Sequence, residues 1–187
     1  MENKLPEIKK RVKKEKAILM YLDEAVFYVS GTKSKTWAFR GKGTTVVSKA
    51  SRKSVKAFGA ISVEDNPHFH FRFAEVFNGK TFLKFLKGIE RQWKRKIHII
   101  MDNAKYHFSP VVMAWIKSKR KKVTLHPLPS HSPEFNAQEG VWRITRRKMT
   151  HNKFYEGKEE LHAAVFRQFN RFQGNPVYLR GVIEPFK

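Results

Sequence analysis

The chain has no cysteine among its 187 residues. Disulfide bonds and zinc sites built on thiolates are therefore excluded, and a reducing compartment is favoured. The sequence also has no apolar run near the roughly 20 residues that a membrane-spanning helix needs. Its N-terminus shows charges but no apolar signal-peptide region. We therefore expect a soluble, cytoplasmic protein without a membrane partner.

Acidic residues are scarce. The chain carries 16 aspartates and glutamates against 39 lysines and arginines, which gives a formal net charge of +23. So large a charge of one sign indicates a polyanionic partner, with nucleic acid first and an acidic membrane surface second. The alternative is a basic surface that only keeps the protein soluble.

The apolar residues, at 41% of the sequence, are enough for one folded domain, and they alternate between strand and helix patterns. We expect a basic arm of residues 1–16, either a helix or flexible, followed by one mixed α/β domain of residues 17–187. Its central sheet should be covered on both faces. Strands are predicted at 17–22, 37–39, 44–46, 55–63, 70–76, 97–101 and 122–126, and helices from Gly79, from Pro110, near Glu139 and at 158–172. Residues 25–29 either continue the first strand or begin another element.

Only three aspartates are present, and two of them follow apolar strands: Asp23 and Asp102. In α/β sheets, ligands bind at the carboxyl ends of the strands. If the two strands are neighbours, both carboxylates meet at one edge, where they could bind divalent cations against a phosphate. The alternatives are turn chemistry at Asp102-Asn103 and a solvated strand end at Asp23-Glu24.

A third acid could come from the segment before the predicted helix at Trp142. Glu139 stands three residues after Asn136, which also fits a structural capping box. Glu134 could equally lie at the helix N-terminus because of the helix dipole. Geometry alone leaves both glutamates as candidates.

Three motifs resemble those of mariner-like DDE transposases, most closely the branch found in prokaryotic insertion sequences. The first is Tyr21-Leu22-Asp23-Glu24. The second is Met101-Asp102-Asn103-Ala104, with His107. The third, and most specific, runs from Leu128 to Trp142 and contains Ser132-Pro133-Glu134-Phe135-Asn136 and Glu139. The resemblance covers roughly residues 17–172.

This resemblance implies a ribonuclease H-like fold, a mixed sheet of five strands flanked by helices. It implies that Asp23, Asp102 and Glu139 are the catalytic and metal-binding residues, whereas Glu134 matches a non-catalytic acid. The cofactor would be Mg²⁺, with Mn²⁺ as a substitute, and two ions are expected. The activity would be cleavage of transposon ends and strand transfer into target DNA, by a homodimer bound to double-stranded DNA at the nucleoid.

Further residues surround this triad. Glu24, Asn103 and His107 are expected beside the metal ligands, although packing would equally explain His107. Three arginines are expected to contact DNA, with an ordinary exposed basic helix as the alternative: Arg143, Arg146 and Arg147. Trp142 is interpreted as a core residue, and the other histidines show no zinc-site spacing.

The sequence departs from the family pattern at Ala137-Gln138 and at His131. About 16 residues precede the first strand, so the N-terminal helix-turn-helix domain of the family is expected to be absent, and a separate region or reading frame would then supply sequence recognition. Two rival functions stay open: a nuclease of the same fold that only hydrolyses, and a DNA-binding remnant without catalysis.

Overall fold

Five strands and six α-helices follow one another along this computed structural model, which describes residues 4–43, 45–46, 50–118, 122–129 and 133–187. The strands are β1 Ile18–Tyr28, β2 Ser54–Ser62, β3 Phe69–Ala74, β4 Ile97–Met101 and β5 Val123–Pro127. The helices are α1 Lys4–Lys14, α2 Gly79–Gln92, α3 Pro110–Ser118, α4 Gln138–Thr145, α5 Lys158–Gly174 and α6 Val177–Ile183. A 3₁₀ turn, η1 (Lys105–Phe108), precedes α3, and a π-helical turn, η3 (Arg146–Thr150), extends α4.

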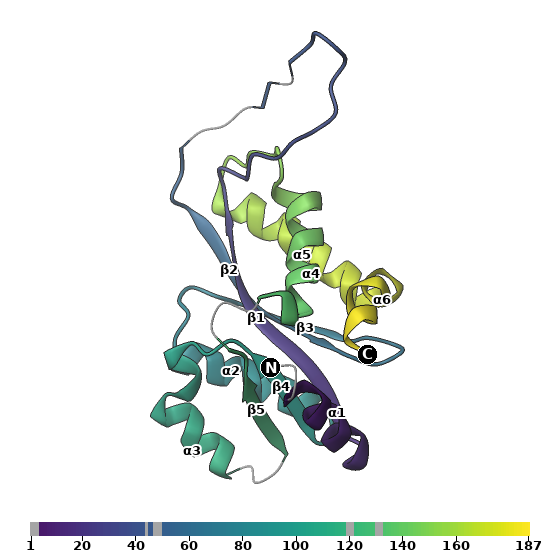
Figure 1. Cartoon of the computed structure of the whole chain (residues 1–187). Coiled ribbons are helices and arrows are strands. Elements are labelled where there is room, and N and C mark those ends of the chain that lie inside the picture. The colour runs from purple at the N-terminus through teal and green to yellow at the C-terminus, as the bar shows by residue number, and fades with distance from the viewer. Residues whose placement is uncertain (1–3, 44, 47–49, 119–121, 130–132) are drawn as a thin grey trace.

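The strands form one mixed sheet in the order β3-β2-β1-β4-β5. β1 pairs antiparallel with β2, and β2 with β3, whereas β1 with β4 and β4 with β5 are parallel. The parallel connections cross over through helices, as parallel pairs require. This confirms the predicted sheet of five strands flanked by helices (Figure 1).

β1 is longer than predicted, and Asp23 lies within it rather than at its end. The strand continues to Tyr28 because β2 pairs with it from Met20, opposite Ser62, to Tyr28, opposite Ser54. Pairing with β4 stops at Tyr21. Asp23 therefore lies just past the point where the parallel part of the sheet ends. The expected strand end at Asp23 was wrong, and the alternative that residues 25–29 continue the strand is confirmed as far as Tyr28.

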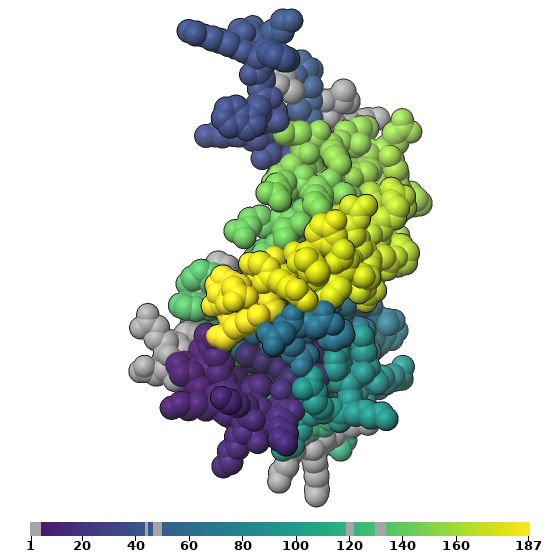
Figure 2. Space-filling model, turned by 90° about the vertical axis from the view of Figure 1, so that its right-hand side faces the viewer, coloured from purple at the N-terminus to yellow at the C-terminus, as the bar shows by residue number. Residues whose placement is uncertain are grey.

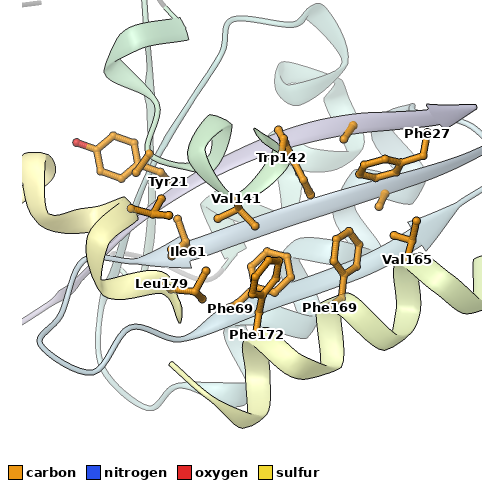
Figure 3. Packing of buried hydrophobic residues seen from close by; sticks show 14 of the residues in the cluster. Tyr21, Phe27, Ile61, Phe69, Val141, Trp142, Val165, Phe169, Phe172 and Leu179 are labelled. Carbon is orange, nitrogen blue, oxygen red and sulfur yellow. The ribbon is translucent and has the colours of Figure 1, made fainter. Parts of the chain in front are cut away.

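The two faces of the sheet bury separate cores because side chains alternate along each strand. On one face, Met20 and Leu22 of β1 pack with the apolar side chains of α2 and α3. On the other face, Tyr21 and Phe27 pack with Trp142 and the apolar residues of α4, α5 and α6 (Figure 3). The predicted covering of both faces is confirmed, and Figure 1 shows the two helical groups on opposite sides of β1.

The segment between β1 and β2 contains no strand at Trp37–Phe39, where one was predicted, nor at residues 45–46. Thr44 of the second predicted strand lies outside the described residues. Trp37 is 99% exposed and Phe39 is 84% exposed, so neither has a neighbouring strand to pack against. The described part of this segment projects beyond the body of the molecule (Figure 1).

The ends of the described chain are both helical. Residues 4–14 of the basic arm form α1, which buries Ile8 against the core, so the helical alternative for this arm is confirmed. The C-terminal segment, for which the sequence predicted no element, forms α6 and buries Leu179 and Ile183. The C-terminal residues (yellow) lie beside α1 (purple) in Figure 2, and Lys9 Nζ donates a hydrogen bond to the backbone oxygen of Lys187 at 2.6 Å. No helix in the described ranges is long and apolar enough to cross a bilayer.

Candidate metal centre

Asp23 and Asp102 come from neighbouring parallel strands. Tyr21 of β1 is paired with Ile100 of β4. Two residues further along each strand, Asp23 lies level with Asp102, which directly follows β4. Alternation along β1 directs Asp23 to the face covered by α4 and Glu24 to the face covered by α2. The sheet edge therefore presents acidic side chains on both of its faces.

Trp142 of α4 holds the Asp23 carboxylate. Its indole Nε1 donates a hydrogen bond to Asp23 Oδ2 at 2.9 Å, while the rest of the ring is buried. Helix and strand lie close enough here that a side chain on Gly59, the β2 partner of Asp23, would collide with the Trp142 ring. The sequence indicated only a core role for Trp142, since an indole donor leaves no mark in residue spacing.

Burial raises the pKa of Asp23 to about 8, and the negative charges of Glu24 and Glu139 add to this rise. The hydrogen bond from Trp142 acts in the opposite direction and does not compensate. Burial opposes ionisation of a carboxyl group, and nearby negative charges add to this effect. Glu139, on the first turn of α4, is one of these charges.

His107 joins the other two acids. Its Nε2 lies 2.8 Å from Glu24 Oε1, and its Nδ1 lies 3.1 Å from Asp102 Oδ1. Glu24, Asp102 and His107 bring ligand atoms within 4.8 Å of one another, which a metal ion could bridge. Asp102 Oδ1 also accepts the backbone N–H of Ala104 at 3.1 Å, so the carboxylate is held in a turn while half of its side chain stays exposed.

The electrostatics around His107 show how strongly negative this edge is. Burial lowers the pKa of His107, but its hydrogen bonds to Asp102 and Glu24 and their charges outweigh burial and raise the pKa to about 9. These same bonds hold the pKa of Asp102 below its usual value. Burial, with the charges of Glu24, Asp102 and Asp23, raises the pKa of Tyr106. In this geometry the imidazolium supplies positive charge between two carboxylates.

Glu139 is half-buried on the first turn of α4 and lines a cleft of about 650 Å³ together with Glu134 and Arg143. The capping box that was the structural alternative for Glu139 does not form: the helix begins after Ala137, without a side-chain cap. The amide of Asn136 is used elsewhere. It donates to the backbone oxygen of Leu22, beside Asp23, and accepts from the backbone of Gln138.

The arginines that were expected to contact DNA differ in exposure. Arg143 is exposed in the Glu139 cleft, and Arg147 is exposed on η3. Arg146 is instead half-buried, with its guanidinium 5.9 Å from the ring centre of Phe27. Asn103 is exposed, and its side chain has no hydrogen-bond partner among the described residues. Residues 130–132 of the third motif lie outside the described ranges.

Two features escaped the sequence reading. The first is the contact of His107 with both Glu24 and Asp102. Side chains along β1 alternate between the two faces of the sheet, so Glu24 lies on the opposite face from Asp23, and this alternation was a signal that Glu24 has a different partner. Gln138 is fully buried beside Gly59, and neither of its amide atoms has a hydrogen-bond partner among the described atoms. Its position at the start of an amphipathic helix gave no signal of this.

Solved structures with a similar fold include several of Mos1. The chain is similar to the Mos1 strand transfer complex, with 16% identity over 97% of this chain and 54% of that chain and a TM-score of 0.62. It is similar to the Mos1 mariner paired end complexes with Mn and with Mg, at 12% and 11% identity over 92% of this chain and 58% and 60% of those chains, with TM-scores of 0.59 and 0.55. The chain thus spans somewhat over half of their length. A comparison with curated proteins found no match.

The order of the five strands, together with these likenesses, defines a ribonuclease H-like domain of the integrase and transposase type. The family model of the DDE superfamily endonuclease matches residues 18–162, which include all three acidic motifs. The chain belongs to this family of DDE superfamily endonucleases.

Proposed function

We propose that this chain is the catalytic domain of a DNA transposase of the prokaryotic insertion-sequence branch, which cleaves transposon ends and transfers the cut strand into target DNA. The observation that carries the proposal is the environment of Asp23. Its half-buried carboxylate is held by Trp142, feels the charges of Glu24 and Glu139, and is level with Asp102. Asp23, Asp102 and Glu139 are the proposed metal ligands.

The donor set fits a hard divalent cation. Carboxylate oxygens are the ligands that Mg²⁺ and Mn²⁺ prefer. The negative charges of Glu24 and Glu139 help to raise the pKa of Asp23, and a bound cation would oppose that rise. Two ions at this edge would supply charge stabilisation at a phosphate and activation of a hydroxyl or water. Paired end complexes of Mos1 contain Mn or Mg, which supports the same choice of ion here.

The protein's own side chains would position the reaction. Trp142 fixes one oxygen of Asp23 by a hydrogen bond and so would orient this carboxylate toward a bound ion. His107 sets the orientation of Asp102 and Glu24 from between them. Arg143, exposed in the cleft beside Glu139, is placed to bind a DNA phosphate. Preorganisation of this kind, rather than covalent chemistry, is what in-line phosphoryl transfer needs from a protein.

The proposed substrate is double-stranded DNA, both transposon end and target, bound by a homodimer. Base recognition would come from a helix-turn-helix region or a separate reading frame. The net charge of +23 supports backbone binding, and the Mos1 structures are described as paired-end and strand-transfer complexes.

The test is cleavage of a labelled transposon-end duplex in Mn²⁺. Asp102→Asn and Glu139→Gln should each lower the cleavage rate by at least about a hundredfold, because each removes a charge that holds the ions. Glu134→Gln is the matched control: it lines the same cleft, and its cleavage rate should stay within severalfold of wild type.

Wild-type cleavage rates in both triad variants would contradict the site, and an equal loss in Glu134→Gln would reopen the choice of third acid. Cleavage without any joined product would favour the purely hydrolytic nuclease, and no cleavage at all would favour the non-catalytic remnant.

A further inference from the structure

The outer face of α2 is lined with cations. Its fully exposed positions carry Lys80, Lys84, Lys87 and Arg91, with only Gln92 besides. These four residues follow one another at spacings of four, three and four, so they form one stripe along the helix. At about 1.5 Å of rise per residue, the stripe is about 16 Å long.

None of the four cations forms an ion pair with another described residue. Some cations elsewhere do: Arg95 pairs with Glu64, and Lys158 pairs with Glu75. The one acid on α2, Glu90, forms an ion pair with Lys122, which directly precedes β5. Like charges at these spacings repel one another and destabilise a helix. The helix forms because its apolar face and the Asn78–Thr81 capping box stabilise it.

The stripe begins next to the candidate metal centre. The first residue of α2, Gly79, packs against Ser109 and the backbone of Tyr106, in and beside the η1 turn that carries His107. From there α2 runs along the sheet face opposite to α4, α5 and α6 (Figure 1). The arginines expected to contact DNA lie on that other side, in α4 and η3.

We propose that this stripe of α2 binds the phosphate backbone of duplex DNA that continues away from the reaction centre. The inference rests on the proposed function, because duplex DNA is the ligand. Each strand of a duplex advances about 3.4 Å per phosphate along its axis, so 16 Å of cations spans about five phosphates of one strand. Side chains that contact phosphate alone carry no base specificity.

The test is fluorescence anisotropy of a labelled 30-base-pair duplex of arbitrary sequence, without divalent metal, over a range of KCl concentrations. The variant Lys84→Gln/Lys87→Gln/Arg91→Gln should reduce the slope of log K against log salt by about 2.7, at about 0.9 for each phosphate contact. The control Arg167→Gln/Arg171→Gln/Arg180→Gln removes the same charge from exposed positions of α5 and α6. Its slope should change by less than about 1. Equal changes in both variants, or no change in the first, would overturn the proposal.

Two further measurements separate the possible failures. The natural chain has no cysteine, so Lys84→Cys and Arg171→Cys each give one attachment point for a photo-crosslinker. Only the first should crosslink to the duplex, and the reverse pattern would overturn the proposal. Binding is measured without metal, so its outcome is separate from that of the cleavage assay. If Asp102→Asn and Glu139→Gln both cleave at the wild-type rate while the α2 variant loses its slope, the proposed catalytic site fails and the α2 surface stands.

Discussion

The side chains at the sheet edge differ in how much of their role the sequence could reveal. Asp102 was predicted directly, because an acid after an apolar strand is visible in the pattern. The hydrogen bond from Trp142 to Asp23 joins residues 119 positions apart. The contact of His107 with Glu24, which is half of the bridge to Asp102, joins residues 83 positions apart. Contacts over such distances depend on packing, which spacing along one chain does not encode.

The pKa shifts of Asp23 and His107 predict how the stability of the metal-free protein depends on pH. Asp23 has a folded pKa of about 8, above its ordinary 3.8, so its effect weakens the fold as pH rises toward 8. His107 has a folded pKa of about 9, above 6.5, so its stabilisation is complete below 6.5 and is lost as pH rises to 9. Both effects have the same sign between pH 7 and 9.

Urea unfolding in EDTA should therefore give a lower free energy of unfolding at pH 9 than at pH 7, by on the order of a few kcal/mol at about 1.4 kcal/mol per pKa unit. The midpoint of the urea transition should fall with it. Asp23→Asn cannot ionise, so its decline should be shallower than that of wild type. Histidines whose pKa is lowered by burial act below this window: His70, His98 and His126. A midpoint that stays level or rises from pH 7 to 9 would show that these two groups are not as the structure places them.

Among the elements, the strands and long helices were the most predictable, because apolar alternation or helical periodicity marks each of them. Errors arose where a polar residue serves the tertiary structure. Asn136 resembled a helix cap but holds β1 through the oxygen of Leu22. β1 continued through Asp23 and Glu24 because β2 pairs with this stretch. Trp37 and Phe39 resembled strand residues but have no partner strand.

The contact between α4 and β2 carries an element-scale prediction. A Cβ at Gly59 would lie 2.5 Å from the Trp142 ring and 2.6 Å from Gln138 Nε2. Gly59→Ala should therefore lower the free energy of unfolding by about 1–3 kcal/mol, the usual cost of overpacking a core. It should also weaken Mn²⁺ binding, because Trp142 must move and Asp23 loses its hydrogen bond.

Gly181→Ala is the control, since a Cβ there meets nothing within 4 Å. It lies within α6, where alanine is the better helix former, so its unfolding free energy should stay level or rise by up to about 1 kcal/mol. Both quantities are measured by urea unfolding and by calorimetric titration with Mn²⁺. If Gly59→Ala matches Gly181→Ala in both, the close approach of α4 to β2 is not needed for the site.

At the scale of the whole molecule, the chain combines one small acidic centre with a basic surface. Its 16 acids are outnumbered by 39 lysines and arginines, yet Asp23, Glu24, Asp102 and Glu139 gather at one edge of the sheet. Acids so close together repel one another, and protonated His107 offsets part of this repulsion in the metal-free protein; a bound cation would offset more of it. Under the proposed function, the basic surface would attract DNA, and the acidic edge would hold the ions that act on its phosphates.

The most direct test of this account locates the metal itself. Fe²⁺ is added in place of Mg²⁺, and ascorbate with peroxide then generates hydroxyl radicals that cut the backbone next to the bound ion. The account predicts cuts near residues 23, 102 and 139, which are distant in sequence, and their loss when excess Mg²⁺ competes or when Asp23→Asn and Asp102→Asn are combined. Cuts elsewhere, or cuts that persist in the double variant, would contradict a metal centre built on these three acids.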